Sequence, residues 1–297
     1  MRNLKLNRVV VFLGHVVMQD RGGGMSHAIP AFSVRLQRHC VSPRQVARAG
    51  DIWRLCQEAA VRASGESGWS GQRFIDEGVG FIVSRMTVVH DREITYGEPV
   101  SARTWIRDWR RDTLSRREVR LSVGETPIAR ATQQWVHVRL EGDGGGITPA
   151  RASSDLLACF PAKDVDEPMV QLPKVAEAIS SAPHYFRLDV WHTWMDPFAH
   201  VNHPVYVDWA DEAIARKLVA AGYDPQKLVP VAEQVRFKRG LEGGTSVMVE
   251  TQLEGFTVDG HVVLRHRIDT VAGQAAADVR TVRGFIGDQP DWLAVFA

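Results

Sequence analysis

The feature of this sequence that most constrains its fold is an internal repeat of one helix followed by a run of strands. In each half, a segment with apolar residues at helical spacing precedes segments that alternate apolar and polar residues at every second position. The turn glycines Gly97 and Gly244 lie 147 residues apart, and Gly124 and Gly273 lie 149 residues apart. Such a long period indicates two domain-sized copies rather than a solenoid, whose repeats are several-fold shorter.

The first copy is predicted to hold a helix over about residues 42–63. Ser42 and Pro43 give a start signal, and Ile52, Cys56 and Ala59 share one helical face. Alternating strands are predicted at 100–108 and 118–123, separated by turn residues in "YGEP" and "VGETP". The second copy repeats this order, with a strand at 185–191, a helix from about 203 to Gly222, and strands at 245–253 and 261–269.

The segment between the copies is rich in Gly, Pro, Ser and Asp, which is typical of a linker. At the N-terminus, His15 interrupts an apolar run that no small-residue cleavage pattern follows, so we expect a loose tail or a start codon placed too early rather than a signal peptide. The predicted organisation is a tail at 1–28, a first unit at 29–145, a linker at 146–182 and a second unit at 183–297.

One helix with four or five antiparallel strands can bury both apolar faces if the sheet curls around the helix, which is an α+β solution. This architecture is the hotdog fold, and two copies in one chain are expected to pair their sheets side by side, a tandem (double) hotdog. Substrate would then bind between the copies. A monomer is sufficient as a pseudo-dimer, and a homodimer stays open.

The overall charge and the cysteines exclude several classes of partner. A formal net charge of +1 gives no general attraction to nucleic acid or to a membrane surface. The three cysteines, Cys40, Cys56 and Cys159, are widely spaced and form no CxxC pair, which argues against a disulfide framework and a cysteine zinc site. We therefore expect a cytoplasmic protein with no metal, no nucleic-acid partner and no membrane span.

The stretch "WHTWMDPFAHVNHPVYVDWADEA", residues 191–213, carries the strongest chemical signal. A metal site is disfavoured because Pro197 and Pro204 interrupt the regular spacing that paired histidine ligands need. Taken singly, its polar residues could merely cap a helix or close a turn. Taken together, Asp196 and His200 place a base and a proton-handling group at the start of a long helix, beside free N–H donors. Such donors could stabilise the oxyanion that forms when a thioester is attacked.

The segment "DPFAHVNHPVYVDWADEA" resembles the signature of hotdog thioesterases, in which an Asp is followed by His-Val-Asn and then by Tyr, Trp and an acidic residue on the helix. The first half, "FIVSRMTVVHDREITYGEPVSARTWIRDWRRDTLSRREVRL" with "ARATQQWVHV", is similar to the first hotdog of acyl-acyl-carrier-protein (acyl-ACP) thioesterases. The resemblance covers most of residues 30–285. It implies hydrolysis of an acyl-ACP or acyl-CoA thioester in fatty acid or related acyl metabolism, with no cofactor.

The resemblance also implies roles for particular residues. The catalytic Asp and His of the family fall on Asp196 and His200, whereas the Asn between them is Phe198 here and a second Asn is His203. The family's acidic or cysteine residue falls near Gly240 or Leu241, one step before Glu242. Either Glu242 and Asn202 or His203 complete the network, or the protein handles another acyl group or carrier. We expect Asp196 to attack the thioester or activate water, His200 to orient it, and N–H groups after Asn202 to hold the oxyanion.

Aligning the helices on Glu58 and Glu212 sets Ser42 against Asp196 and Val46 against His200, so the first unit lacks the catalytic pair. The first unit is expected to shape the acyl pocket, although plain core is the alternative for its apolar residues. Carrier proteins are acidic, so we expect a basic surface where one would bind. Arginines that alternate along a solvent-exposed strand are the alternative explanation of the same pattern. Candidate substrate-binding residues are Phe198, His203, Tyr206, Trp53, Met86 and Trp105, and candidate carrier-binding residues are Arg110, Arg111, Arg116, Arg117, Lys238 and Arg239.

Two other functions stay open. A hotdog hydratase or dehydratase would space its Asp and His one residue wider, with Asn and Pro before the His, which "DPFAH" does not match. A non-catalytic acyl-binding protein could keep the fold with an altered site, as the Phe198 replacement allows.

Overall fold

A computed structural model describes residues 29, 31–141 and 146–297, and the predicted tail at 1–28 lies outside these residues. The first copy contains β1 (Ala31–Arg35), η1 (Arg38–Cys40), α1 (Ala49–Glu66), α2 (Gly71–Asp76), β2 (Val79–His90), β3 (Pro99–Arg110), β4 (Leu114–Val123) and β5 (Thr126–Leu140). The second contains β8 (His184–Asp189), η2 (His192–Trp194), α4 (Val205–Ala220), η3 (Pro225–Lys227), β9 (Leu228–Phe237), β10 (Ser246–Phe256), β11 (Val262–Thr270), β12 (Ala275–Phe285) and α5 (Trp292–Val295). The segment between them holds β6 (Ile147–Pro149), α3 (Ser154–Cys159) and β7 (Glu177–Ala178).

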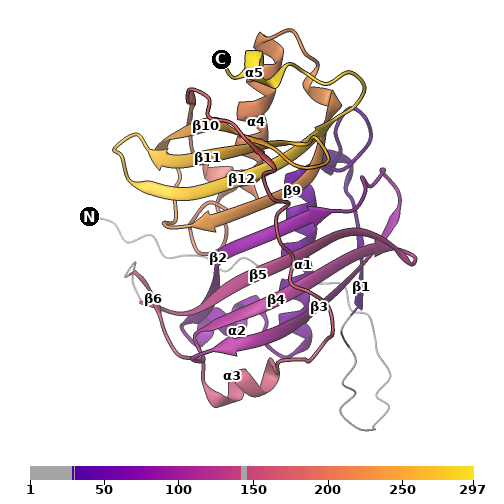
Figure 1. Ribbon diagram of the computed structural model, residues 1–297. Helices are drawn as coiled ribbons and strands as arrows, with labels where there is room; N and C mark the ends of the chain where they lie inside the picture. The colour runs from indigo at the N-terminus through magenta and orange to yellow at the C-terminus, as the bar shows by residue number, and fades with distance from the viewer. Residues whose placement is uncertain (1–28, 30, 142–145) are drawn as a thin grey trace.

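The two copies have the same strand order. The first sheet runs β1-β3-β4-β5-β2 and the second runs β8-β10-β11-β12-β9, so that the strand before each helix lies at one edge and the strand after it at the other. The edge strands β2 and β9 pair antiparallel, with Val88 opposite Glu233, and join the two into one continuous sheet. Figure 1 shows β2 and β9 side by side at the middle of the molecule. The predicted double hotdog fold is confirmed.

Helices and linker cover opposite faces of this sheet (Figure 1). On the helix side, α1 and α4 pack together so closely that a Cβ at Gly50 would come within 1.9 Å of Asp208 Oδ1. On the other side the linker crosses both sheets: Glu167 pairs with Arg120 of the first sheet at 2.7 Å, and Leu172 and Val175 pack against buried residues of the second, among them Val263. The sheet therefore has one face that packs on the helices and one that the linker shields.

One apolar core runs through both units because each helix buries its apolar stripe against its own sheet and against the other helix. It includes Trp53 of α1, Tyr206 of α4, Val119 of β4 and Val249 of β10. None of the described helices is both long and apolar enough to cross a membrane.

A buried charge network lies within this core. Glu233 is fully buried and accepts hydrogen bonds from Trp53 Nε1 at 3.0 Å and from Arg283, and it pairs with His90 Nε2 at 2.7 Å. Burial alone would raise the pKa of Glu233, but His90 and Arg283 lower it to about 2. Because Trp53 and His90 belong to the first copy, the network ties the two units together.

The first helix starts later than the sequence predicts. α1 begins at Ala49, and residues 42–48 instead form a turn in which the Ser42 N–H donates to Val46 O at 2.8 Å and Gln45 has φ +64°. The Ser-Pro pair that imitates a helix start opens this turn. The error matters because the equivalent turn in the second copy carries Asp196 and His200.

Candidate active site

A cavity of about 850 Å³ lies between the two copies. Its walls come from α1, α2 and the strands of the first unit, and from residues 196–206 and 237–242 of the second. This volume lies within the range of ligand sites in proteins. The residues of the second unit that line it include Asp196, Phe198, His200, His203, Tyr206, Lys238, Arg239 and Glu242.

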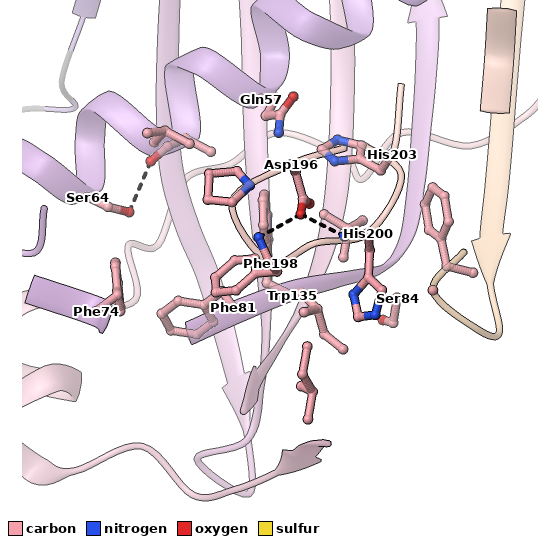
Figure 2. A pocket seen from close by; sticks show the side chains of 18 of the residues that line it. Gln57, Ser64, Phe74, Phe81, Ser84, Trp135, Asp196, Phe198, His200 and His203 are labelled. Carbon is pink, nitrogen blue, oxygen red and sulfur yellow. Dashed lines mark hydrogen bonds between the residues drawn. The ribbon is translucent and has the colours of Figure 1, made fainter. Parts of the chain in front are cut away.

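Asp196 opens a tight turn that ends at His200. The Asp196 N–H donates to His200 O at 2.7 Å and the Ala199 N–H donates to Asp196 O at 3.0 Å, which places Ala199 in the left-handed region at φ +59°. The carboxylate Oδ1 accepts the N–H groups of Phe198 at 2.8 Å and His200 at 3.4 Å (Figure 2). The turn therefore fixes the carboxylate against its own backbone.

The electrostatics of Asp196 suit a base. Burial raises the pKa of this carboxyl, and the two backbone N–H donors only partly oppose that effect. Among the described residues, Oδ2 accepts no hydrogen bond, so one carboxylate oxygen stays available to the cavity.

The side chains of His200 and Asp196 form no ion pair within 4.0 Å among the described residues. The His200 ring instead lies on Gly240, where an added Cβ would come within 2.6 Å of its Cδ2. The ring therefore occupies the space that a side chain at position 240 would need. Glu242 lines the cavity from an exposed position.

His203 is a neutral histidine. Burial, with a smaller contribution from Arg54, lowers its pKa to about 3. Its ring lies among aromatic rings, with centroids 6.4 Å from Trp53, 6.1 Å from Trp135 and 6.0 Å from Phe237, and no described residue hydrogen-bonds to its Nε2. Tyr206 follows in the first turn of α4, and burial raises the pKa of its hydroxyl.

Asn202 is predicted as a catalytic residue, but the structure turns it away from the cavity. Its Oδ1 accepts a hydrogen bond from Gln57 Nε2 of α1 at 2.9 Å. Gln57 itself lines the cavity (Figure 2). Sequence reasoning missed Gln57 because nothing in the first unit marks it as a partner of a loop 145 residues away.

Phe198 replaces a polar family residue, and Gly80 explains how it fits. An added Cβ at Gly80 of β2 would lie 2.9 Å from the Phe198 ring, so the ring packs against bare backbone. Phe198 contributes a backbone N–H to Asp196 and an apolar ring to the cavity wall.

The prediction that Trp53, Met86 and Trp105 line the pocket is wrong. All three are at most 2% exposed and none lines the cavity. Trp53 and Met86 pack in the core between helices and sheet, whereas Trp105 lies on the linker side of the sheet, with Arg120 over its ring at 5.1 Å. Other aromatic residues line the cavity instead, and only their position in the folded sheet and in α2 and α3 reveals them: Trp69, Phe74, Phe81, Trp109, Trp135 and Phe160.

The structure places the residues of the predicted basic face in different parts of the molecule. Arg110 and Arg111 are exposed at the β3–β4 turn, whereas Arg116 pairs with Asp108 on the linker side. Arg117 is buried and lines the cavity, so it is not part of any surface patch. Lys238 and Arg239 are exposed beside the cavity, and Lys238 pairs with Asp278 at 2.7 Å.

The first unit keeps the turn without its chemistry. Ser42 occupies the position of Asp196, Gln45 that of Ala199 and Val46 that of His200. The turn has the same pair of backbone hydrogen bonds and a left-handed residue at the same position.

Within the described residues, no group of three or more His, Cys, Asp or Glu side chains could hold a metal ion.

Comparison with known proteins agrees with this arrangement. The thioesterase-like superfamily matches residues 190–290, which contain the Asp196 turn. No curated protein matches the chain significantly. Three solved structures share the fold at low identity, which supports the architecture alone.

A Lactobacillus plantarum protein assigned as an oleoyl thioesterase superposes with a TM-score of 0.73 at 16% identity, over 89% of this chain and 98% of that one. An acyl-ACP thioesterase from Bacteroides thetaiotaomicron gives 0.65 at 12% identity, over 86% and 98%. The 12:0-ACP thioesterase from Umbellularia californica gives 0.65 at 15%, over 86% and 94%. The chain therefore has the double hotdog fold of acyl-ACP thioesterases, and its second unit matches the thioesterase-like superfamily.

Proposed function

We propose that the chain is a thioesterase that hydrolyses an acyl-ACP or acyl-CoA thioester to the free acid and the thiol. The observation that carries the proposal is Asp196, a carboxylate of raised pKa fixed at the rim of a cavity between two hotdog units, in the segment that the superfamily matches. The cavity is large enough for an acyl group, and aromatic side chains such as Phe81 and Trp135 line it beside Asp196 and His200.

In this proposal Asp196 takes a proton from water, which attacks the thioester carbonyl carbon. The carbonyl oxygen becomes an oxyanion, and N–H groups at the start of α4, at the positive end of the helix dipole, stabilise it. The C–S bond then breaks, the acid forms, and the thiolate leaves and takes up a proton. His200, held flat on Gly240, orients the water and handles the proton transfer.

Lys238 and Arg239 would meet the phosphates of the carrier, because both are exposed beside the cavity. We expect Arg239→Ala to raise KM for CoA and ACP thioesters in a salt-dependent way. The rate on a truncated thioester without phosphates should not change, since that substrate offers Arg239 no anion.

The activity is tested by mixing the purified protein with acyl-CoA and acyl-ACP panels and following free thiol. We expect Asp196→Asn to lower kcat by a factor of about 10²–10⁴. Ser42→Ala is the matched control, since Ser42 holds the same turn position in the first unit. Intact turnover in Asp196→Asn contradicts the proposed mechanism, and acyl binding with no turnover in the wild type would indicate an acyl-binding protein instead.

A further inference from the structure

Arg117 is a buried cation whose side chain faces the cavity. It lies on β4 at 6% exposure, on the same side of the strand as the core residues Val119 and Leu121. Arg117 and Ser115 both line the cavity, and Ser115 is its neighbour on this side of β4. The adjacent Arg116 points to the opposite face and pairs with Asp108.

Within the part of the chain that the structure describes, the guanidinium of Arg117 makes one hydrogen bond. Its Nη1 donates to Thr104 Oγ1 at 3.3 Å, and no described carboxylate lies within ion-pair distance. A guanidinium carries five N–H donors, so most of these are left for other acceptors. Burial lowers the pKa of Arg117 to about 10, which still leaves it charged at neutral pH.

The other deeply buried arginine shows what such a group normally requires. Arg283 is 1% exposed and pairs with both Asp211 and Glu233, which raise its pKa. Buried charges in proteins are generally paired, because an uncompensated one is costly. Arg117 lacks the carboxylate that Arg283 has, and its free donors meet the space that a ligand would fill.

Arg117 lines the cavity from a strand that lies away from the Asp196 turn. The Asp196 turn rests on β2 through Phe198 and Gly80, whereas β4 lies two strands further into the first sheet, about 10 Å across. Trp135 of β5 lines the cavity between them. An acyl group bound at Asp196 would therefore run past an aromatic wall toward Arg117.

We propose that Arg117 binds a carboxylate at the distal end of the acyl group, so that the substrate is a carboxyl-terminated acyl thioester. Guanidinium and carboxylate match in a bidentate geometry that a methyl-ended chain cannot satisfy. A hydrocarbon end would leave the charge buried against methylene groups. The inference rests on the proposed thioesterase function and names its substrate class.

The turnover test uses CoA thioesters of matched length whose acyl chains end in a carboxylate, a primary amide or a methyl group, in a series of increasing length. We expect kcat/KM for the carboxylate to exceed that for the methyl-ended chain by about 100-fold or more at the best length. Arg117→Met should abolish this preference, while Arg139→Met, an exposed arginine of β5, should retain it. Equal or better hydrolysis of the methyl-ended chain by the wild type, or an unchanged preference in Arg117→Met, overturns the inference.

A binding test separates this inference from the proposed function. Free dicarboxylates and monocarboxylates of the same lengths are titrated calorimetrically into wild type and Arg117→Met. If no thioester is hydrolysed but dicarboxylates bind preferentially through Arg117, the thioesterase proposal fails and the Arg117 site stands. If thioesters are hydrolysed with no Arg117-dependent preference in either assay, the Arg117 site fails alone. The thermal midpoint of ligand-free Arg117→Met, expected at or above that of wild type because a buried charge is removed, shows that the variant folds.

Discussion

At the scale of single residues, the site depends on what surrounds Asp196 and His200 rather than on their identity alone. Asp196 is held by two backbone N–H groups of its own turn, and His200 lies on a glycine. No ion pair within 4.0 Å joins the two side chains among the described residues, but the His200 N–H donates to the Asp196 carboxylate and the charge of His200 lowers the pKa of Asp196.

The pKa of Asp196 predicts a pH dependence. Burial raises it above the ordinary value of 3.8, and the carboxyl acts as a base only when ionised. We expect the acid limb of kcat/KM to fall with its midpoint above that value, measured over a pH range in which circular dichroism shows the fold intact. A midpoint at or below the ordinary value would contradict a base in this environment.

The same shift predicts a change in stability. A carboxyl whose folded pKa exceeds its unfolded pKa costs stability once the pH is above both values, since ionisation is then less favourable in the folded state. Asp196→Asn removes this cost and can still accept the Phe198 N–H, so its thermal midpoint at neutral pH should equal or exceed that of wild type. A clear drop would indicate that the carboxylate stabilises the turn.

Gly240 tests the placement of His200. In Gly240→Ala the new Cβ would lie 2.6 Å from the imidazole, so the ring must move. A displacement of about 1 Å can cost about 10²-fold in rate, and we expect a loss of that order in kcat by thiol-release assay. Gly65→Ala is the control, because its Cβ would meet nothing within 4 Å in α1; it should keep full activity.

At the scale of elements, the turn before each helix is a structural unit that both copies share. Both copies build it with a left-handed residue that is not glycine, Gln45 at φ +64° and Ala199 at φ +59°. The second copy places Asp196 on this frame and the first places Ser42, so that in the proposed mechanism only the second turn supplies a base.

Glycine at these positions should relieve backbone strain. We expect Ala199→Gly and Gln45→Gly each to raise the free energy of unfolding by up to about 1 kcal/mol in urea denaturation, because glycine adopts this φ without a Cβ penalty. Ala199→Gly should keep its turn hydrogen bonds and its activity. Destabilisation of either variant would mean that the turn relaxes to another conformation.

At the scale of the whole molecule, the two hotdog units form one cooperative body. The β2–β9 pairing makes the sheet continuous, and Glu233 joins Trp53 and His90 of the first unit to Arg283 of the second. Gln57 of the first unit also donates a hydrogen bond to Asn202 of the second. The site exists only because both units are held in register.

Glu233 provides the test of that coupling. Glu233→Gln leaves His90 without its carboxylate partner and Arg283 with Asp211 alone, and we expect a loss of about 3 kcal/mol in the free energy of unfolding. Because the folded pKa of Glu233 is lowered to about 2, wild type should lose this contribution as the pH falls from about 4.5 toward that value, and the variant should not. The control is Glu212→Gln, an exposed i,i+4 partner of Arg216, which should cost at most about 0.5 kcal/mol.

The sequence by itself determined the duplication, the double hotdog architecture and the Asp196 turn as the candidate site. These features depend on periodicity and on the spacing of nearby residues, which can be read directly from the order of residues. Only the tertiary structure decided which residues meet in the cavity. Trp53, Met86 and Trp105 look like pocket residues but are buried outside the cavity, Asn202 turns to Gln57, and Arg117 faces the cavity while Arg116 points away from it. Which face of a curled sheet a side chain occupies, and what stands opposite it in the other unit, follows from long-range strand pairing that local patterns do not record.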